Sequence, residues 1–382
     1  MPRPDSNPSP RERDGERIAA LRLIRSENVG PVTYRELIGH FGSAAAALAA
    51  LPELSRSGGF RRPIRLCPRH EAEAELQRVA ENGAHLLFVG EPVYPPALAA
   101  LDAPPPALYA KGELLLLQRP MVAIVGARQC SAAGTQVARL FAAGLGRGGF
   151  VIASGLARGI DAAAHTAAID TGTVAVLAGG LDVVYPPEHA ELQGTIAKRG
   201  CLVSEMPFGF TPRGQDFPRR NRIVSGLSLG VVIVEAARRS GSLVTARLAA
   251  EQGREVFAVP GHPLDPRAEG ANKLLKSGAT LVTEPNDVLS ALTPLTQVPG
   301  PARQFLREEA TRPVGPPAQV SDPERERIPR SARALANRHR QYCALNRTEH
   351  PAVCKSRLSS WRSPGRIERH GSGLVSLTLP SL

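Results

Sequence analysis

The sequence predicts an α/β protein built on a Rossmann-like, doubly wound and mostly parallel sheet. Between Met121 and about Leu292, short runs of β-branched and other apolar residues alternate with Ala-rich amphipathic stretches. Nearly continuous apolar strands are typical of a parallel sheet that is covered on both faces. Strand–helix alternation implies right-handed crossovers, which place helices on both faces of such a sheet.

Seven segments of this region have the composition of strands: "VAIVG" (122–126), "FVIASG" (150–155), "VAVLAG" (174–179), "CLVSE" (201–205), "GVVIVEA" (230–236), "EVFAVPG" (255–261) and "ATLVT" (279–283). Three helical stretches separate several of them: "SAAGTQVARLFAAGL" (131–145), "IDAAAHTAAIDTG" (160–172) and "LVTARLAAEQG" (243–253). "GLGRGG" (144–149) matches a dinucleotide fingerprint, but it follows a helix and precedes a strand. We interpret it as a helix C-cap and turn.

Residues 1–112 predict a small, mostly helical N-terminal domain with a connector. "DGERIAALRLIRSENV" (14–29) has apolar residues at helical spacing, and Gly42 divides the following stretch into two short helices. Such helix pairs occur in SAM and helix-hairpin-helix DNA-binding domains, and they also occur in plain bundles. The Rossmann-like domain is expected over residues 113–292, and a Pro-rich linker over residues 293–326.

Composition favours a polyanionic partner. The 382 residues carry a net charge of +12, which suits nucleic acid first and an anionic membrane surface second. The alternative is an Arg-rich protein without such a partner. No apolar run reaches the roughly 18 residues that span a bilayer, and the polar start is not a signal peptide. Five widely spaced cysteines favour a cytoplasmic protein with reduced thiols and no zinc site.

Basic residues gather where ligands of a doubly wound sheet bind, at the carboxyl ends of the strands. Most predicted strands end in glycine or a small polar residue, which lets backbone amides approach an anion. Arg128 follows the first strand. Arg213, Arg219, Arg220 and Arg222 surround Phe217 just before the strand at 230–236. These side chains predict one basic rim, with Ser242 as the expected cap of the next helix.

Catalytic candidates are few. Asp161 and His165 lie four residues apart and are either an acid–base or metal-binding pair, or a helix-dipole carboxylate with a buried histidine. We favour the second interpretation, because no third ligand is spaced nearby. Asp182, Glu205 and Glu235 could serve a hydrolase, although Glu235 is more simply expected to pair with the neighbouring arginines. The sequence has no G-x-S-x-G motif and no P-loop.

Five motifs in order carry a family resemblance: "AIVGARQCSAAG", "ASGLARGIDAAAH", "FPRRNRIVSGLS", "VVIVEAARRSGSLVTARLAAEQGR" and "VFAVPGHPLDPRAEGANKLLKSGA". They closely resemble the bacterial DNA-processing protein A family, DprA, also called Smf. The resemblance is strong from Tyr94 to about Leu292 and weaker in the helical N-terminus.

The resemblance implies a cytoplasmic protein that binds and protects incoming single-stranded DNA during natural transformation and loads the recombinase RecA onto DNA covered by single-strand-binding protein. It also implies a homodimer, no catalytic activity and no cofactor. The DNA-binding positions that it implies are Gly126, Arg128, Arg213, Phe217, Arg220, Asn221, Arg222, Gly241 and Ser242.

Single-stranded DNA exposes both its bases and its phosphates, so a site for it needs cations and an aromatic ring on which a base stacks. Arg128, Arg220 and Arg222 are expected to hold phosphates and Phe217 to stack, with helix amides at Ser242 taking another phosphate. The alternative for Phe217 is a place in the core.

The family usually ends in a winged-helix domain, and residues 327–382 predict only a degenerate remnant of one. "GRIERHGSGLVSLTLP" (365–380) has the alternation and Gly-rich turn of the wing hairpin, but the Arg-rich stretch before it has no apolar period. We interpret that stretch as the product of compensating frameshifts or a sequencing error, with divergence as the alternative.

A second function remains open at this point. Related Rossmann-like proteins process nucleoside monophosphates, as phosphoribohydrolases do, through a Pro-Gly-Gly-x-Gly-Thr loop. The corresponding region here reads "EAARRSGSLVTA" (235–246), which lacks that loop.

Overall fold

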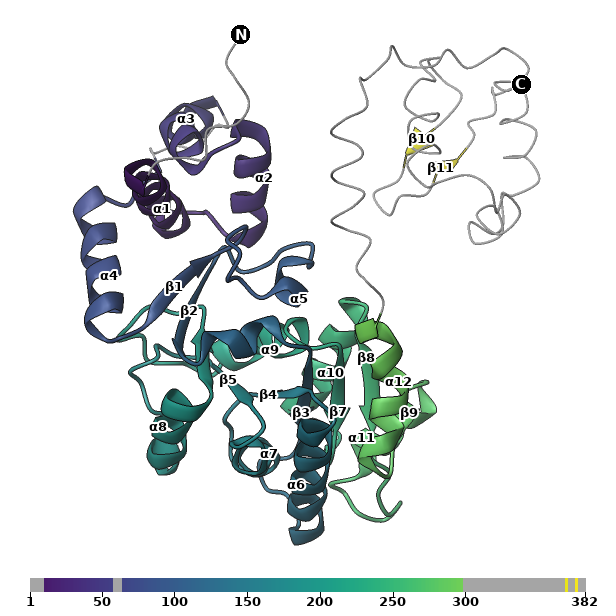
Figure 1. Ribbon diagram of the computed structural model, residues 1–382. Coiled ribbons are helices and arrows are strands. Elements are labelled where there is room, and N and C mark those ends of the chain that lie inside the picture. Colours follow the sequence, from purple (N-terminus) through teal and green to yellow (C-terminus); the bar gives the residue numbers. More distant parts are fainter. Residues whose placement is uncertain (1–9, 58–63, 298–367, 370–374, 377–382) are drawn as a thin grey trace, which may run out of the picture. The chain divides into compact units, whose positions relative to one another are not determined.

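A nine-stranded sheet organises the larger of two structural units in the computed structural model, Met1–Pro299 (Figure 1). The structure describes residues 10–57, 64–297, 368–369 and 375–376. The strands lie in the order β1-β2-β6-β5-β4-β3-β7-β8-β9. Their bounds are β1 His85–Phe88, β2 Ala107–Gly112, β3 Met121–Val125, β4 Val151–Ser154, β5 Thr173–Leu177, β6 Cys201–Ser204, β7 Gly230–Ile233, β8 Glu255–Ala258 and β9 Thr280–Leu281.

All seven predicted strands are present as β3 to β9, and every pairing among them is parallel. Strands β1 and β2 were not predicted, because residues 1–112 were expected to be mostly helical. They pair antiparallel with each other, and β2 pairs antiparallel with β6. Their apolar runs are four to six residues long and flanked by Pro or Gly, so no periodicity distinguishes them from loop or helix.

Helices cover both faces of the sheet, as the continuous apolar strands predict. Alternate residues of β3 join different cores: Met121 and Ala123 pack with helix α9, whereas Val122 and Ile124 pack with helices α6 and α7. The bounds of the helices in this domain are α6 Ala132–Arg147, α7 Ile160–Ala168, α8 Ala190–Arg199, α9 Asp216–Gly226, α10 Gly241–Glu251, α11 Glu269–Lys276 and α12 Pro285–Gln297. "GLGRGG" forms the last turn of α6 and its C-cap at Gly148, as interpreted.

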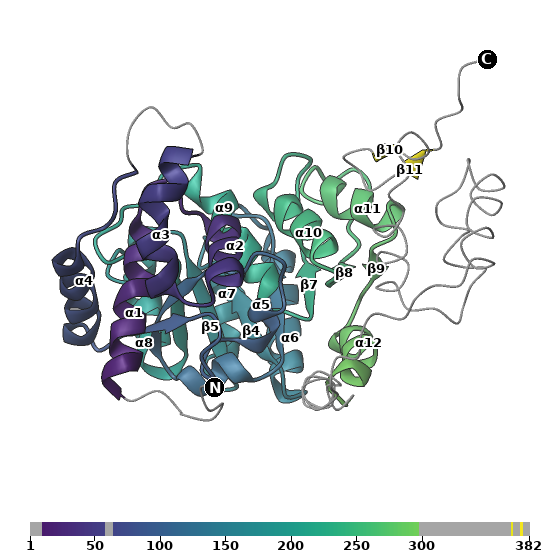
Figure 2. The ribbon, with the colours of Figure 1, turned by 90° about the horizontal axis from the view of Figure 1, so that it is seen from above.

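The N-terminal helices gather beside β1 (Figure 1), and α1, α2 and α3 lie side by side (Figure 2). They are α1 Pro10–Arg25, α2 Pro31–Phe41, α3 Ala44–Ser57 and α4 Arg69–Glu81, followed by the short α5 Pro96–Ala99. Gly42 ends α2 with a positive φ of 77°, as the sequence predicts. Residues of α1 to α4 share one hydrophobic core with β1, β2, β5 and β6, so these helices rest directly on the sheet.

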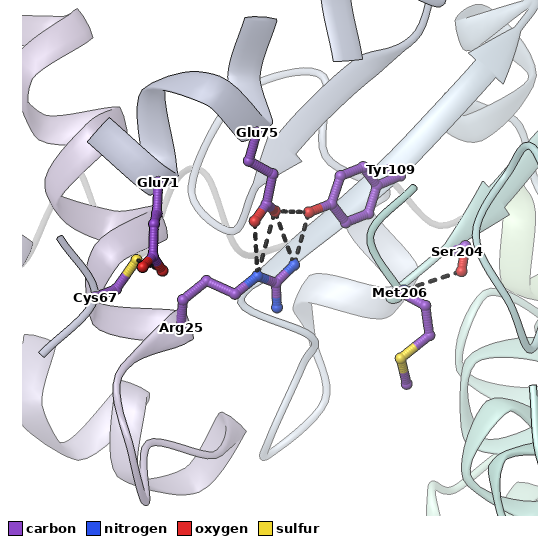
Figure 3. A network of polar contacts seen from close by, with 7 residues as sticks. All are labelled: Arg25, Cys67, Glu71, Glu75, Tyr109, Ser204 and Met206. Atoms are coloured by element: carbon purple, nitrogen blue, oxygen red, sulfur yellow. Dashed lines mark hydrogen bonds and ion pairs between the residues drawn. The ribbon is translucent and has the colours of Figure 1, made fainter. Parts of the chain in front are cut away.

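A polar cluster also joins the N-terminal helices to the sheet (Figure 3). Arg25 of α1 donates to Glu75 of α4 at 2.9 Å and to the hydroxyl of Tyr109 in β2 at 2.7 Å. The Tyr109 hydroxyl donates to the same carboxylate, and burial raises the pKa of Tyr109. Three elements that are distant in sequence are therefore fixed to one another by a charged, satisfied network.

Helix α9 was not predicted, although it contains most of the basic stretch that precedes β7. Its buried residues include Asp216, Arg220, Ile223 and Val224, which follow helical spacing. Arg220 occupies a buried position at which an amphipathic helix usually has an apolar residue, so the helical periodicity of apolar residues is not visible in the sequence. Pro218 lies in the first turn, where the missing N–H group breaks no helical hydrogen bond.

The C-terminal predictions are tested only in part. Helix α12 continues to Gln297, so residues 293–297 are helical and not linker as expected. In the second unit, Gly300–Leu382, β10 (Glu368–Arg369) pairs antiparallel with β11 (Val375–Ser376), as predicted for the hairpin. The rest of the linker and winged-helix predictions lies outside the described residues.

Candidate nucleic-acid interface

The order of the strands places a binding crevice at the carboxyl ends of β3 and β7. From β3 the chain proceeds through β4, β5 and β6 to one side, and then returns to place β7 on the other side of β3. Loops that follow strands on the two sides of such a switch point diverge and leave space for a ligand. The candidate interface is therefore built from the loops after β3, β4, β5 and β7 together with the start of α9, which follows β6.

Glu235, just after β7, fixes the start of α6. Its carboxylate accepts from the Ser131 amide at 2.9 Å and from the Ser131 hydroxyl at 2.5 Å. The same hydroxyl caps α6 by accepting from the Gly134 amide at 2.8 Å. The expectation that Glu235 pairs with arginines is wrong, because Ser131 lies closer across the switch point.

Two glycines bring the loops after β3 and β4 together. A Cβ on Gly126 would lie 2.7 Å from the Ile160 side chain and 3.0 Å from the Glu235 carbonyl oxygen. Gly159 has a φ of 74°, and a Cβ there would collide with the Ala127 carbonyl. The backbone on both sides of Arg128 is thus tightly packed, and the exposed Arg128 side chain projects from a rigid base.

Arg128 and Phe217 meet at the surface, although 89 residues separate them in the sequence. The guanidinium carbon of Arg128 lies over the Phe217 ring, 5.3 Å from its centroid, which is a cation–π contact. Phe217 is half-buried and lines a surface pocket, so it is not a core residue. The structure brings these two predicted positions together.

Tyr185 completes this surface cluster and was not predicted. Its ring centroid lies 5.0 Å from that of Phe217, with the planes tilted by 48°. The side chain is 43% exposed. The available signal was an aromatic residue in the glycine-containing loop after β5, "AGGLDVVYPP" (178–187), at the same sheet edge as the other loops.

A narrow pocket opens between Arg128, Tyr185 and Phe217, and Arg220 forms part of its lining. It encloses about 30 Å³, which is room for water and not for a nucleobase. A flat ligand therefore meets the outer surface of the cluster.

Arg220 was expected on the exposed rim, and this is wrong. It is 6% exposed and donates to the Gly155 carbonyl at 2.5 Å and to the Val176 carbonyl. Its pKa is lowered to about 10, mainly by burial and to a smaller extent by the charge of Arg128, while nearby Asp161 acts in the opposite direction. The guanidinium remains charged at neutral pH and supports the loop after β4 from beneath.

The other arginines of this stretch differ in whether their guanidinium groups are free to bind a ligand. Arg222 was expected to hold a phosphate, but its guanidinium already pairs with the carboxylate of Glu205 at 2.5 Å and is only 20% exposed. Arg219 approaches the same carboxylate at 3.4 Å. Arg213 is exposed, and its backbone is engaged with Asp216: its amide donates to the carboxylate at 2.7 Å and its carbonyl accepts from the Asp216 amide at 2.9 Å. Among the residues that the structure describes, its guanidinium has no ion-pair partner. Arg213 is therefore the freer cation.

The start of α10 differs by two residues from the expectation. Ser240 caps the helix, and its hydroxyl accepts from the Ser242 amide at 3.3 Å. Ser242 was expected as the cap, but it is buried and its hydroxyl bonds that of Ser240 at 2.7 Å. Gly241 is exposed, and the Asn221 amide group donates to its carbonyl at 3.4 Å. Helix α9 and the start of α10 therefore meet through these predicted positions.

Asp161 and His165 are structural, as favoured from the sequence. Asp161 is 6% exposed, and its carboxylate accepts from the amides of Gly155 and Ala157. His165 is fully buried, its Nδ1 lies 2.7 Å from the Thr173 hydroxyl, and burial lowers its pKa to about 3. Neither side chain is accessible to a substrate.

Residues 10–57 and 64–297 contain no group of three His, Cys, Asp or Glu side chains arranged to hold a metal ion. In the same part of the chain, no single helix is long and apolar enough to cross a membrane, although the bent pair Pro31–Phe41 and Ala44–Leu54 meets the length and composition test.

Known proteins match most of the described chain. A family model described as DNA recombination-mediator protein A matches residues 85–293, and a DprA-like N-terminal HHH domain matches residues 14–77. Protein Smf of Escherichia coli is 48% identical over 228 residues, which are 59% of this chain and 61% of that protein. The DNA processing protein DprA of Bacillus subtilis is 43% identical over 220 residues, which are 57% of this chain and 74% of that protein.

Two solved structures share the fold and part of the sequence. DNA processing protein A from Streptococcus pneumoniae superposes with a TM-score of 0.62 at 36% identity, covering 72% of this chain and 96% of that one. DNA processing protein A from Helicobacter pylori, solved for its single-stranded DNA binding mode, gives 0.50 at 33% identity, covering 55% and 95%. Since the first family model alone covers more than half of the 382 residues, the chain belongs to the DNA recombination-mediator protein A family, DprA/Smf.

Proposed function

We propose that this protein binds single-stranded DNA across the carboxyl edge of its sheet. The observation that carries the proposal is the surface cluster of Arg128, Phe217 and Tyr185 at the switch point. It combines a cation for phosphate with aromatic rings for bases, which is the combination that binding to single strands requires. The Helicobacter pylori relative, whose structure concerns single-stranded DNA binding, supports the same substrate.

The positive charges of Arg128 and Arg220 support an anionic ligand at the carboxyl edge of the sheet. Arg128 lies close enough to the buried Arg220 for its charge to lower the pKa of that guanidinium. A phosphate beside Arg128 would relieve this repulsion. Arg213 and the start of α10 at Gly241 lie in the neighbouring segments and extend the proposed DNA contacts, whereas Arg222 contributes by holding α9 against Glu205.

The wider role rests on the family. We assign to this protein the protection of incoming single strands and the loading of RecA onto strands covered by single-strand-binding protein, during natural transformation or recombination. A cytoplasmic homodimer without catalytic activity completes the proposal. The accessible chemistry of the Arg128, Phe217 and Tyr185 cluster is cationic and aromatic, and three carboxylates of this region, Glu205, Glu235 and Asp161, are engaged in ion pairs or hydrogen bonds.

Fluorescence anisotropy with single-stranded and blunt duplex DNA of equal length tests the proposal. We expect tighter binding to the single strand with little dependence on base sequence. Equal affinity for the two would contradict it. A parallel incubation with nucleoside monophosphates tests the enzyme alternative, since release of free base would show a nucleotide-processing activity.

A further inference from the structure

Phe217 is not free to stack on a base in the unliganded protein. The Arg128 guanidinium lies over its ring at 5.3 Å, and the Tyr185 ring touches it at a centroid distance of 5.0 Å. A base that stacks on the covered face must first displace the guanidinium. Bases are planar and need an open ring face, so Phe217 alone does not offer a ready stacking surface.

Tyr185 offers the ring surface that Phe217 lacks. Its side chain is 43% exposed, whereas Phe217 is half-buried. Pro186 follows it and is buried, which anchors the loop after β5 directly beside the tyrosine. Within residues 64–297 the Tyr185 hydroxyl has no hydrogen-bond partner, so the ring is held by packing against Phe217. An exposed aromatic ring held in place loses little conformational entropy when a base stacks on it.

We infer that Tyr185 is a base-stacking residue of the single-stranded DNA site and that it receives a base before Phe217 does. This inference rests on the proposed function and assigns the first stacking position within the surface cluster to Tyr185, from the loop after β5. A phosphate draws Arg128 off the Phe217 ring, and that ring then becomes available for a neighbouring base. Tyr185 and Phe217 together form a platform for two bases, with Arg128 moving between ring and phosphate.

The test separates stacking from packing by removing the bases from the ligand. The full chain is titrated with a fluorescent oligothymidine and with an abasic oligonucleotide of the same length and charge. Tyr185→Leu keeps an apolar side chain but no ring, and Tyr185→Phe restores the ring. Val184→Ala is the matched control, because Val184 is the exposed neighbour in the same loop and does not line the pocket.

Tyr185→Leu is expected to weaken binding to oligothymidine by about 5- to 140-fold, the range for one stacked base, and binding to the abasic strand by less than about twofold. Tyr185→Phe should recover most of the loss, and Val184→Ala should bind both ligands as the wild type does. Equal losses on both ligands would overturn the inference by showing that Tyr185 only supports the loop. Unchanged binding by Tyr185→Leu would overturn it as well.

The outcome for Phe217 distinguishes this inference from the proposed function. If Phe217→Leu loses base-dependent affinity while Tyr185→Leu does not, the single-strand site stands and the role of Tyr185 is refuted. If the wild-type protein does not prefer oligothymidine to duplex DNA, the proposed function fails first.

Discussion

Arg128 and Arg220 show how the same residue type serves opposite purposes within one site. Arg128 projects into solvent and contacts an aromatic ring, whereas Arg220 is buried and donates to carbonyls at the ends of two strands. The sequence pattern assigns both arginines to a basic rim, because it does not show that Arg220 lies on the buried face of α9. The structure therefore divides the predicted cluster into an exposed cation, which the proposed function assigns to the ligand, and a buried cation that holds the scaffold.

Substitution of these two arginines should separate stability from binding. Arg220→Met removes the donor to the buried Gly155 and Val176 carbonyls and takes a cation away from buried Asp161, so the free energy of unfolding should fall by about 1–3 kcal/mol or more. Arg128→Met should change it by less than about 0.5 kcal/mol, because Arg128 is exposed. Urea denaturation measures both. An Arg220→Met protein of wild-type stability with weakened DNA binding would return Arg220 to the rim.

Because His165 is buried and neutral, the free energy of unfolding is expected to decrease at acid pH. Its pKa is lowered by burial from 6.5 to about 3, so between these pH values the unfolded chain takes up a proton that the folded chain does not. Stability should therefore fall as pH decreases through this window, by at most about 1.4 kcal/mol per pH unit from this group. Above pH 6.5 the histidine is neutral in both states and contributes no pH dependence.

The matched variant is His165→Gln, which cannot titrate. Between about pH 7.5 and pH 5, the wild type should lose about 2 kcal/mol more unfolding free energy than the variant does. Parallel losses in the two proteins would mean that His165 is protonated in the folded state.

At the scale of elements, the loop after β7 and the start of α6 act as one unit through Glu235 and Ser131. This contact crosses the switch point and sets the position of Arg128, which lies three residues before Ser131. The sequence placed Glu235 correctly at a strand end but gave it the wrong partner. Strand order decides which loops become neighbours, and strand order depends on the tertiary fold.

Glu235→Ala should lower the free energy of unfolding by about 1–3 kcal/mol, since it leaves the Ser131 amide without its carboxylate. Glu251→Ala is the control, because that carboxylate is 60% exposed and, within the described part of the chain, forms an ion pair only with the exposed Arg247. Its cost should stay below about 1 kcal/mol. Thermal unfolding compares the two variants, and equal costs would show that the Glu235 contact adds nothing specific.

The long, strongly patterned elements could be predicted from the sequence, and the short or irregular ones could not. Strands β3 to β7 are buried at every residue and almost wholly apolar, and this pattern is local, whereas β8 and β9 become exposed toward the edge of the sheet. Helix α9 carries Arg220 on its buried face, and β1 and β2 lie within a stretch rich in proline. Tyr185 could not be assigned, because its role depends on a ring contact with Phe217 across 32 residues of sequence.

At the scale of the whole molecule, the described fold through α12 contains every residue of the proposed site. The family model also ends at residue 293, within α12. A chain that ends after Gln297 should therefore bind single-stranded DNA within about threefold of the full chain at equal ionic strength, allowing for a modest loss of non-specific charge. Anisotropy titrations of both proteins provide the comparison. A loss of tenfold or more, on the order of 1.4 kcal/mol, would show that residues 298–382 contribute directly.

The central claim is that the carboxyl edge at the β3–β7 switch point is the DNA-binding surface. Arg128 lies at this edge, and Arg147 lies at the other end of α6, exposed at the opposite edge. The most direct measurement is the salt dependence of oligothymidine affinity for Arg128→Ala and Arg147→Ala, which remove the same charge. Arg128→Ala should bind more weakly and reduce the log–log salt slope by about 0.7, the value for one lost phosphate contact. Arg147→Ala should keep the wild-type affinity and slope, and identical behaviour of the two variants would contradict the account.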